Sequence, residues 1–168
     1  MSHLSESEIR SFQQARGLSV TGLVDEITAR ALEEAQWKLG DRSLNLQEPP
    51  LMHGDDVAAL QARLTEMGFD CGRVDGIYGP RTELAVKSNL INNYRMGGYL
   101  LIAIGLINLR YQSDQSGVVT SSLSIVIPGA LLLAVTWIPA LAKKLESKAA
   151  QAVCMVLGLI LVAYAVIN

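Results

Sequence analysis

Adjacent acidic residues are the first feature of this sequence that could support catalysis. Three such pairs occur, Asp25-Glu26, Glu33-Glu34 and Asp55-Asp56. A general acid and a general base must face the same substrate, whereas neighbouring residues on a helix point in different directions. We interpret the pairs as solvated helix faces or helix caps, and the sequence predicts no catalytic residue.

The cysteines and histidines do not have the spacing of metal ligands. Cys71 lies in a predicted turn, Cys154 lies in an apolar stretch, and His3 and His53 are far apart in the sequence. Structural zinc sites group four such ligands at short intervals. The sequence therefore predicts no metal site, no cofactor and no disulfide framework.

Charge is distributed unevenly between the two halves of the chain. Residues 1–95 contain ten Lys and Arg and fourteen Asp and Glu, whereas residues 96–168 contain four and two. Nucleic-acid-binding surfaces need clustered Lys and Arg. The acidic first half therefore excludes nucleic acid as an expected partner.

A short motif occurs twice in the first half. Val20-Thr21-Gly22-Leu23 recurs 54 positions later as Val74-Asp75-Gly76-Ile77, and Thr28 recurs in the same register as Thr82. Each copy is typical of a Gly-centred tight turn that leads into a helix. We expect the threonine hydroxyl to cap that helix by accepting from a backbone amide.

Helical periodicity surrounds both turns. Apolar residues from Ile27 to Leu39 predict an amphipathic helix in the first copy. Residues 57–67 predict another helix ahead of the second turn, with Asp55 and Asp56 as its caps. Residues 44–53 show little periodicity and include Pro49-Pro50, so a linker is expected there.

These residues resemble a known family. The stretches Gly54–Leu64, Gly68-Phe69 and Val74–Val86 resemble the peptidoglycan-binding domain type 1 pattern, and Ile9–Gly22 resembles the second half of the same module. The segment Ala35–Arg42 is similar to the spacer between tandem copies in actinobacterial N-acetylmuramoyl-L-alanine amidases. The resemblance covers residues 8–88 and implies partial modules at 1–43 and 54–93, joined by the linker 44–53.

Both modules are incomplete. The family's module is a three-helix unit whose middle helix carries a Phe-Gln pair, and in the second copy Asn89-Leu90-Ile91 stands in its place. The two halves could associate as one permuted three-helix domain. Alternatively, residues 82–93 could complete the second module. The sequence leaves both arrangements open.

The resemblance also implies a binding site. In the family, the Asp-Gly-aromatic-Gly turn and its flanks help to shape a shallow cleft for muropeptide or glycan. The matching positions here are Asp75, Gly76, Tyr78, Gly79, Arg81 and Thr82. A purely structural interpretation is that the glycines and Asp75 build the turn while Tyr78 packs on the helices.

The family's amidases place their zinc ligands and catalytic acid in a separate downstream domain. Apolar stretches follow the modules here instead, at about 96–110, 117–142 and 149–168. Crossing a hydrocarbon core of about 30 Å takes roughly 20 helical residues. The second and third stretches meet that length. The first stretch is short, so it could either span the membrane or form a re-entrant or surface-lying helix. The sequence therefore predicts an all-α chain with two or three transmembrane helices in residues 94–168.

Loop charges predict the orientation in the membrane. The loop after the second stretch carries Lys143, Lys144 and Lys148, whereas the loop before it carries Arg110. Cytoplasmic loops are enriched in Lys and Arg. The chain is therefore predicted to be a multi-pass protein of the bacterial cell membrane, with a cytoplasmic amino-terminal domain and the carboxyl terminus outside.

Two functions are consistent with these features. In the first, the chain is a non-enzymatic, membrane-anchored protein whose module binds cell-wall glycan, muropeptide or a partner in wall synthesis. Its expected partners are peptidoglycan or its precursors, the lipid bilayer and a membrane protein. If the first stretch does not span, the module would face the wall and act as an anchor. In the alternative, the chain is a fusion or chimera whose membrane half is holin-like or unrelated and whose half-modules bind no ligand.

Overall fold

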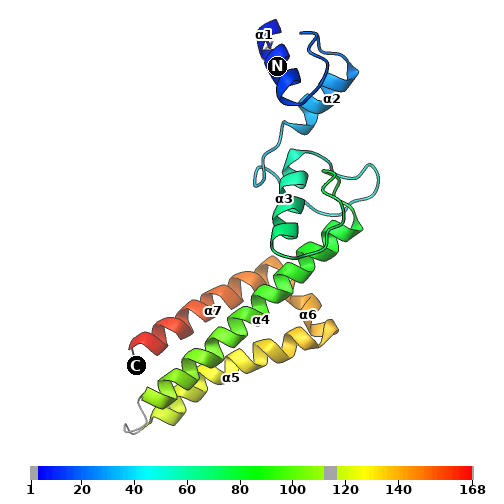
Figure 1. Cartoon of the computed structure of the whole chain (residues 1–168). Coiled ribbons are helices and arrows are strands. Elements are labelled where there is room, and N and C mark those ends of the chain that lie inside the picture. Colours follow the sequence, from blue (N-terminus) through cyan, green and yellow to red (C-terminus); the bar gives the residue numbers. More distant parts are fainter. Residues whose placement is uncertain (1–3, 112–116, 168) are drawn as a thin grey trace. The chain divides into compact units, whose positions relative to one another are not determined.

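The regular structure in the described part of the chain is entirely helical. The computed structural model describes residues 4–111 and 117–167. His3, Asp114 and Asn168 therefore lie outside the described residues. The all-α prediction is confirmed (Figure 1), and the helices are α1 (Glu6–Ala15), α2 (Glu26–Glu34), α3 (Asp55–Glu66), α4 (Pro80–Tyr111), α5 (Val118–Trp137), α6 (Pro139–Leu145) and α7 (Lys148–Ile167).

The chain divides into two compact units, one up to Ala85 and one from Val86 onward. In the first unit, α1 and α2 flank the turn around Gly22, and α3 and the start of α4 flank the turn around Gly76. The helix α4 is continuous across the boundary, so its residues up to Ala85 belong to the first unit and the remainder belong to the second.

Helix α2 is shorter than the periodicity predicts, because it ends at Glu34 and not near Leu39. Beyond it, Lys38 N donates to Asp41 Oδ2 at 2.9 Å. Such local side-chain bonds offer the backbone an alternative to helical hydrogen bonding.

The residues that start the helices also differ from the expectation. Asp25 caps α2 by accepting from Thr28 N at 2.8 Å, and Gly54 precedes α3 without any side-chain cap. The predicted capping by Thr28 and Asp55-Asp56 is therefore wrong. Helix α4 begins with Pro80, which suits a first helical position because its missing N–H would have no partner there.

In the second unit, α4, α5 and α7 are each long and apolar enough to cross a membrane. Helix α5 ends at Trp137, earlier than the predicted stretch 117–142. The reason is Pro139, which disfavours a helical conformation for the preceding Ile138 (φ −101°, ψ 107°) and starts α6.

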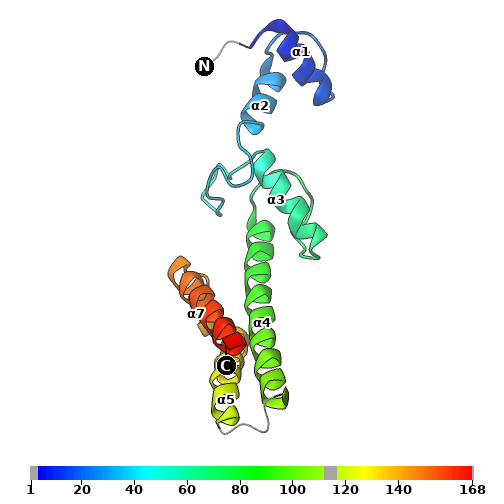
Figure 2. The ribbon, with the colours of Figure 1, turned by 90° about the vertical axis from the view of Figure 1, so that its left-hand side faces the viewer.

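Helices α4 and α5 pack closely through two glycines. A Cβ added to Gly129 on α5 would lie 2.9 Å from both Gly98 O and Leu101 Cβ on α4. Figure 2 shows α5 lying alongside α4. Small residues at such crossings allow two backbones to approach, which is the usual way in which membrane helices associate.

Candidate functional site

The second turn is organised around one buried side chain, Gln61 of α3. Gln61 Oε1 accepts from Asp75 N at 3.1 Å and from Gly76 N at 2.9 Å. Its Nε2 donates to Asp75 Oδ1, Ile77 O and Thr82 Oγ1 at 3.0, 3.1 and 3.1 Å. The amide therefore connects α3, the turn and the first turn of α4, and buried polar groups satisfied in this way hold a unique local conformation.

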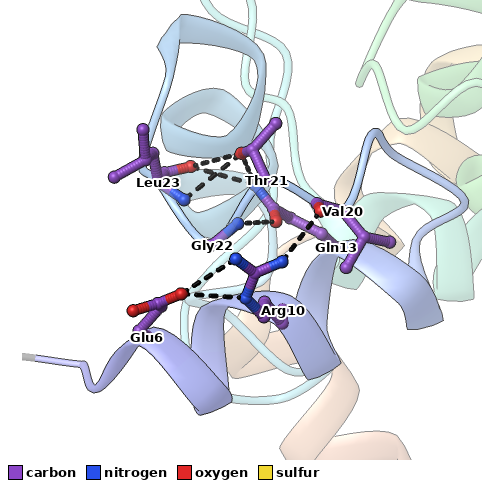
Figure 3. Close-up of polar contacts among 7 residues, drawn as sticks. All are labelled: Glu6, Arg10, Gln13, Val20, Thr21, Gly22 and Leu23. Atoms are coloured by element: carbon purple, nitrogen blue, oxygen red, sulfur yellow. Dashed lines mark hydrogen bonds and ion pairs between the residues drawn. The ribbon is translucent and has the colours of Figure 1, made fainter.

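Gln13 of α1 makes a matching set of bonds with the first turn. Its Oε1 accepts from Gly22 N at 2.9 Å, as Figure 3 shows. Its Nε2 donates to Thr21 Oγ1 and Leu23 O at 3.0 and 2.9 Å, and to Thr28 Oγ1 at 3.0 Å. Thr28 and Thr82 thus do not cap helices, because both hydroxyls accept from the glutamine of the preceding helix.

The organising glutamines were missed in the sequence because the repeat changes register between helix and turn. The turns are 54 positions apart, whereas Gln13 and Gln61 are 48 apart. One sequence pattern is shared by the two glutamines. Each follows a large apolar residue, as in Phe12-Gln13 and Leu60-Gln61, and each lies one helical turn after a buried apolar residue, Ile9 or Val57.

Two ion pairs link the half-modules. Arg42 binds the buried carboxylate of Asp56 at 2.6 Å (Nε to Oδ2) and 2.9 Å (Nη2 to Oδ1). Arg16 binds Asp55 through its two terminal nitrogens, Nη1 and Nη2. Burial raises the pKa of Asp56, but the hydrogen bonds from Arg42 and from Val57 N outweigh that effect and lower it overall. Asp56 is therefore ionised at neutral pH, with its charge neutralised by Arg42.

A cleft of about 530 Å³ lies in the first unit where α2, α3 and the second turn meet. Its lining includes charged side chains of both signs, namely Arg30, Glu34, Asp55 and Asp75. The remaining wall is formed by Leu51, His53, Gly54, Ala58, Gly76 and Ile77. The cleft therefore combines aliphatic surface with a few polar groups, which is the usual composition of a ligand pocket.

The six residues predicted as the site have different environments. Asp75 and Gly76 line the cleft. Tyr78 and Thr82 are buried, and Tyr78 Oη donates to Glu83 Oε2 at 2.8 Å. Burial, assisted by the Glu83 carboxylate, raises the pKa of Tyr78.

Arg81 and Gly79 are not among the residues that line the cleft. The Arg81 side chain is exposed and pairs with Asp70 at 2.7 Å. Gly79 contributes to the start of α4, because its carbonyl accepts from Glu83 N at 3.1 Å. The structure thus brings Asp75 and Gly76 to the cleft and places Tyr78 and Thr82 in the packing beneath the turn.

The corresponding place in the first copy is filled by Arg10. Its Nε and Nη2 bind Glu6 Oε1 at 3.0 and 2.8 Å, and its Nη1 donates to Val20 O at 3.2 Å (Figure 3). A Cβ added to Gly22 would lie 2.8 Å from Arg10 Nε. The guanidinium therefore covers the first turn.

In the second copy, Ala58 stands where Arg10 stands in the first, three residues before the organising glutamine. A Cβ added to Gly76 would be closest to Gly54 O at 3.2 Å and Ala58 Cβ at 3.7 Å. Gly76 lines the cleft and has no side chain like that of Arg10 beside it, although the Gly54 carbonyl lies close to it, whereas the Arg10 side chain lies over Gly22.

Among residues 4–111 and 117–167, no group of three or more His, Cys, Asp or Glu side chains is arranged to hold a metal ion. Asp75 stays ionised at neutral pH because a hydrogen bond from Gln61, and a second from Ile77 N, lower its pKa. The cleft offers a ligand fixed charges and aliphatic contacts.

Comparison with known proteins identifies the segment that contains this turn. Residues 53–88 match the family model described as putative peptidoglycan binding domain. The matched range includes α3, Gln61, the second turn and the first residues of α4. The resemblance to peptidoglycan-binding domains is thereby confirmed for this segment.

A named relative shares a longer part of the chain. Over 83 residues the sequence is 51% identical to the N-acetylmuramoyl-L-alanine amidase CwlM of Mycobacterium tuberculosis (strain ATCC 25618 / H37Rv). The alignment covers 49% of this chain and 20% of that protein, so the chain spans about a fifth of its relative's length. No solved structure matches the chain.

Proposed function

We propose that this chain is a non-enzymatic, membrane-anchored protein whose first unit binds peptidoglycan or its precursors through the cleft beside the second turn. The observation that carries this proposal is the position of the cleft. It lies against Asp75 and Gly76, within the segment that matches a peptidoglycan-binding domain. The turn that forms its wall is held in one conformation by Gln61.

The difference between the two copies supports the choice of the second turn. The side chain of Arg10 lies over Gly22, whereas Ala58 has no such side chain and the cleft adjoins Gly76. A ligand in the cleft would therefore lie beside the second turn. We assign the six predicted residues two roles: Asp75 and Gly76 contact the ligand, while Tyr78, Gly79, Arg81 and Thr82 maintain the fold around it.

Helices α4, α5 and α7 supply the proposed membrane anchor. We place the connection between α5 and α7 in the cytoplasm, because cytoplasmic connections are rich in Lys and Arg. Lys143 and Lys144 lie in α6 of this connection, and Lys148 begins α7. With three spans, the first unit would also face the cytoplasm, where its ligand would be a precursor of the wall.

Retention on purified sacculi tests the binding function. The full-length chain, kept in detergent micelles, should co-sediment with sacculi. Ala58→Arg introduces at the second turn the side chain that fills the first, and should abolish sedimentation. Ala59→Arg is the matched control, because Ala59 is the exposed neighbour on α3 and does not line the cleft.

Sedimentation that is absent for the unaltered chain would refute wall binding and favour half-modules without a ligand. Equal sedimentation of both arginine variants would exclude the cleft as the site. The same samples should release no soluble muropeptides from the sacculi, and such release would refute the non-enzymatic assignment.

A further inference from the structure

Arg10 shows what kind of group the turn accepts. In the first copy a cation lies over the turn glycine, held by the carboxylate of Glu6 and the backbone carbonyl of Val20. The bonds of Gln13 to the first turn are repeated by Gln61 at the second. The backbone that receives the Arg10 cation therefore has a counterpart at Gly76, without the cationic side chain.

The second turn retains acidic groups where a cation would need them. Glu6 has no counterpart on α3, since Gly54 occupies its position seven residues before the glutamine. Asp75 and Glu34 line the open cleft instead. Asp55 also lines it, but its charge is already paired with Arg16.

Arg30 adds a positive charge to the same cleft. It stands four residues before Glu34 on α2, so the two side chains share one face of that helix. Within the described ranges, neither Arg30, Glu34 nor Asp75 forms an ion pair at contact distance with another residue of the chain. The charges of Arg16 and Arg73 act on Glu34 and Asp75 from a longer distance. The cleft therefore presents one positive and two negative charges to a ligand, beside the aliphatic surface of Leu51, Ala58 and Ile77.

We infer that this cleft recognises the peptide stem of peptidoglycan and not its glycan strand, with the free ammonium of the stem's diamino acid bound in the cleft between Asp75 and Glu34. This inference rests on the proposed function. The ammonium supplies a positive charge near the second turn, as the Arg10 guanidinium does at the first, and Arg30 pairs with a carboxylate of the same stem. The neutral sugars of the strand offer no partner for these three charges.

The chemistry predicts sensitivity to modification of the ligand amine. A free side-chain amine is protonated and positively charged at neutral pH, whereas an acetylated or cross-linked amine is neutral. The cleft should therefore prefer uncross-linked stems, such as those of precursors and newly made wall.

Titration of the full-length chain in detergent micelles with three probes tests the inference. The first probe is a disaccharide-peptide whose diamino acid has a free amine. The second is the same compound with that amine acetylated, and the third is the disaccharide without peptide. We expect binding of the first, about two- to fivefold weakening for the second, as loss of a partly exposed ion pair implies, and no binding of the third.

Variants at α2 provide a matched pair. Glu34→Gln should weaken binding of the free-amine probe and reduce the difference between free and acetylated amines. Glu33→Gln, one residue earlier on the same helix and outside the cleft, should leave both unchanged. Because both substitutions are at partly or fully exposed positions, they preserve the fold.

The outcomes separate this inference from the proposed function. Sedimentation with sacculi combined with equal affinity for the free and acetylated amines would overturn the stem assignment and leave wall binding intact. Binding of the disaccharide as tight as that of the free-amine probe would have the same meaning. No sedimentation and no binding of any probe would overturn both.

Discussion

Gln61 Nε2 lies 3.1 Å from Thr82 Oγ1, and this bond joins α3 to α4 across the second turn. Gln13 and Thr28 form the same bond at 3.0 Å between α1 and α2. All four side chains are at most 1% exposed. The pairs α1–α2 and α3–α4 have loops of different lengths, and in both a glutamine–threonine hydrogen bond joins the two helices.

Replacing Gln61 with leucine should destabilise the first unit. The substitution retains the approximate volume but leaves the amides of Asp75 and Gly76 without their acceptor. A buried polar group that loses its partner costs about 1–3 kcal/mol, so we expect the free energy of unfolding to fall by about 2–3 kcal/mol. Chemical denaturation of the full-length chain in detergent, followed by circular dichroism, measures this change.

Gln14→Leu is the control for that experiment, because Gln14 is the exposed neighbour of Gln13 on α1. It should change the free energy of unfolding by less than about 0.5 kcal/mol, as surface substitutions usually do. Similar values for the two variants would show that the buried amide does not stabilise the turn.

Removing Arg42 should leave a buried charge without a partner. Asp56 is 1% exposed, and Arg42 supplies two of its hydrogen bonds. Removing one partner of a buried ion pair is strongly destabilising. The Arg42 side chain is 23% exposed, which reduces this effect, so we expect Arg42→Ala to lower the free energy of unfolding by about 2–3 kcal/mol at pH 7. Arg63→Ala, an exposed substitution on α3, should cost much less.

The pH dependence of stability should change in the same variant. In the unaltered chain the folded-state pKa of Asp56 is lowered. The contribution of ionised Asp56 to the free energy of unfolding is therefore fully present above the unfolded pKa of about 3.9. It is lost as the pH falls through the lower folded pKa. Without Arg42, burial remains and raises this pKa, so Arg42→Ala should lose less stability on acidification from pH 7 to pH 3. If the free energies of unfolding of the two proteins differed by the same amount at every pH in this range, Arg42 would not be the cause of the lowered pKa of Asp56.

Close packing of α4 on α5 predicts a strict size limit at Gly129. A methyl group there would meet Gly98 O and Leu101 Cβ at 2.9 Å, and overpacking of this kind costs about 1–3 kcal/mol. We expect Gly129→Ala to lower the thermal unfolding midpoint of the second unit in detergent. Gly158→Ala on α7 is the control, because a Cβ there meets no atom within 4 Å. An equal shift for both variants would argue against this packing.

The proposed orientation predicts that an amino-terminal tag is protected from protease in intact cells and in spheroplasts. Cleavage should appear only after the membrane is opened. A tag at the carboxyl terminus should be cleaved in spheroplasts, since three spans place the two ends on opposite sides. Cleavage of the amino-terminal tag in spheroplasts would place the first unit on the wall side, where it would act as a wall anchor.

Local patterns were sufficient to predict several features of this protein. Apolar stretches between charged gaps indicated α5 and α7, because a bilayer excludes charge over a fixed length, and the Gly-centred motif indicated both turns. The resemblance in residues 54–86 indicated the peptidoglycan-binding segment. Helix boundaries were less accurate where a local side-chain bond or a proline intervened, as at Asp41 and Pro139.

The tertiary structure decided which of these residues act together. Gln61 contacts residues 14 to 21 positions away, and no periodic pattern encodes a contact at that separation. The cleft likewise combines Arg30 and Glu34 of α2 with Asp75 and Gly76, which are more than 40 positions later. The sequence alone determined the helices, the turns and the membrane-compatible segments because these depend on neighbouring residues. The bonds of the buried glutamines, the position of Arg10 over the first turn and the charges of the cleft depend on packing between distant segments, so only the folded chain reveals them.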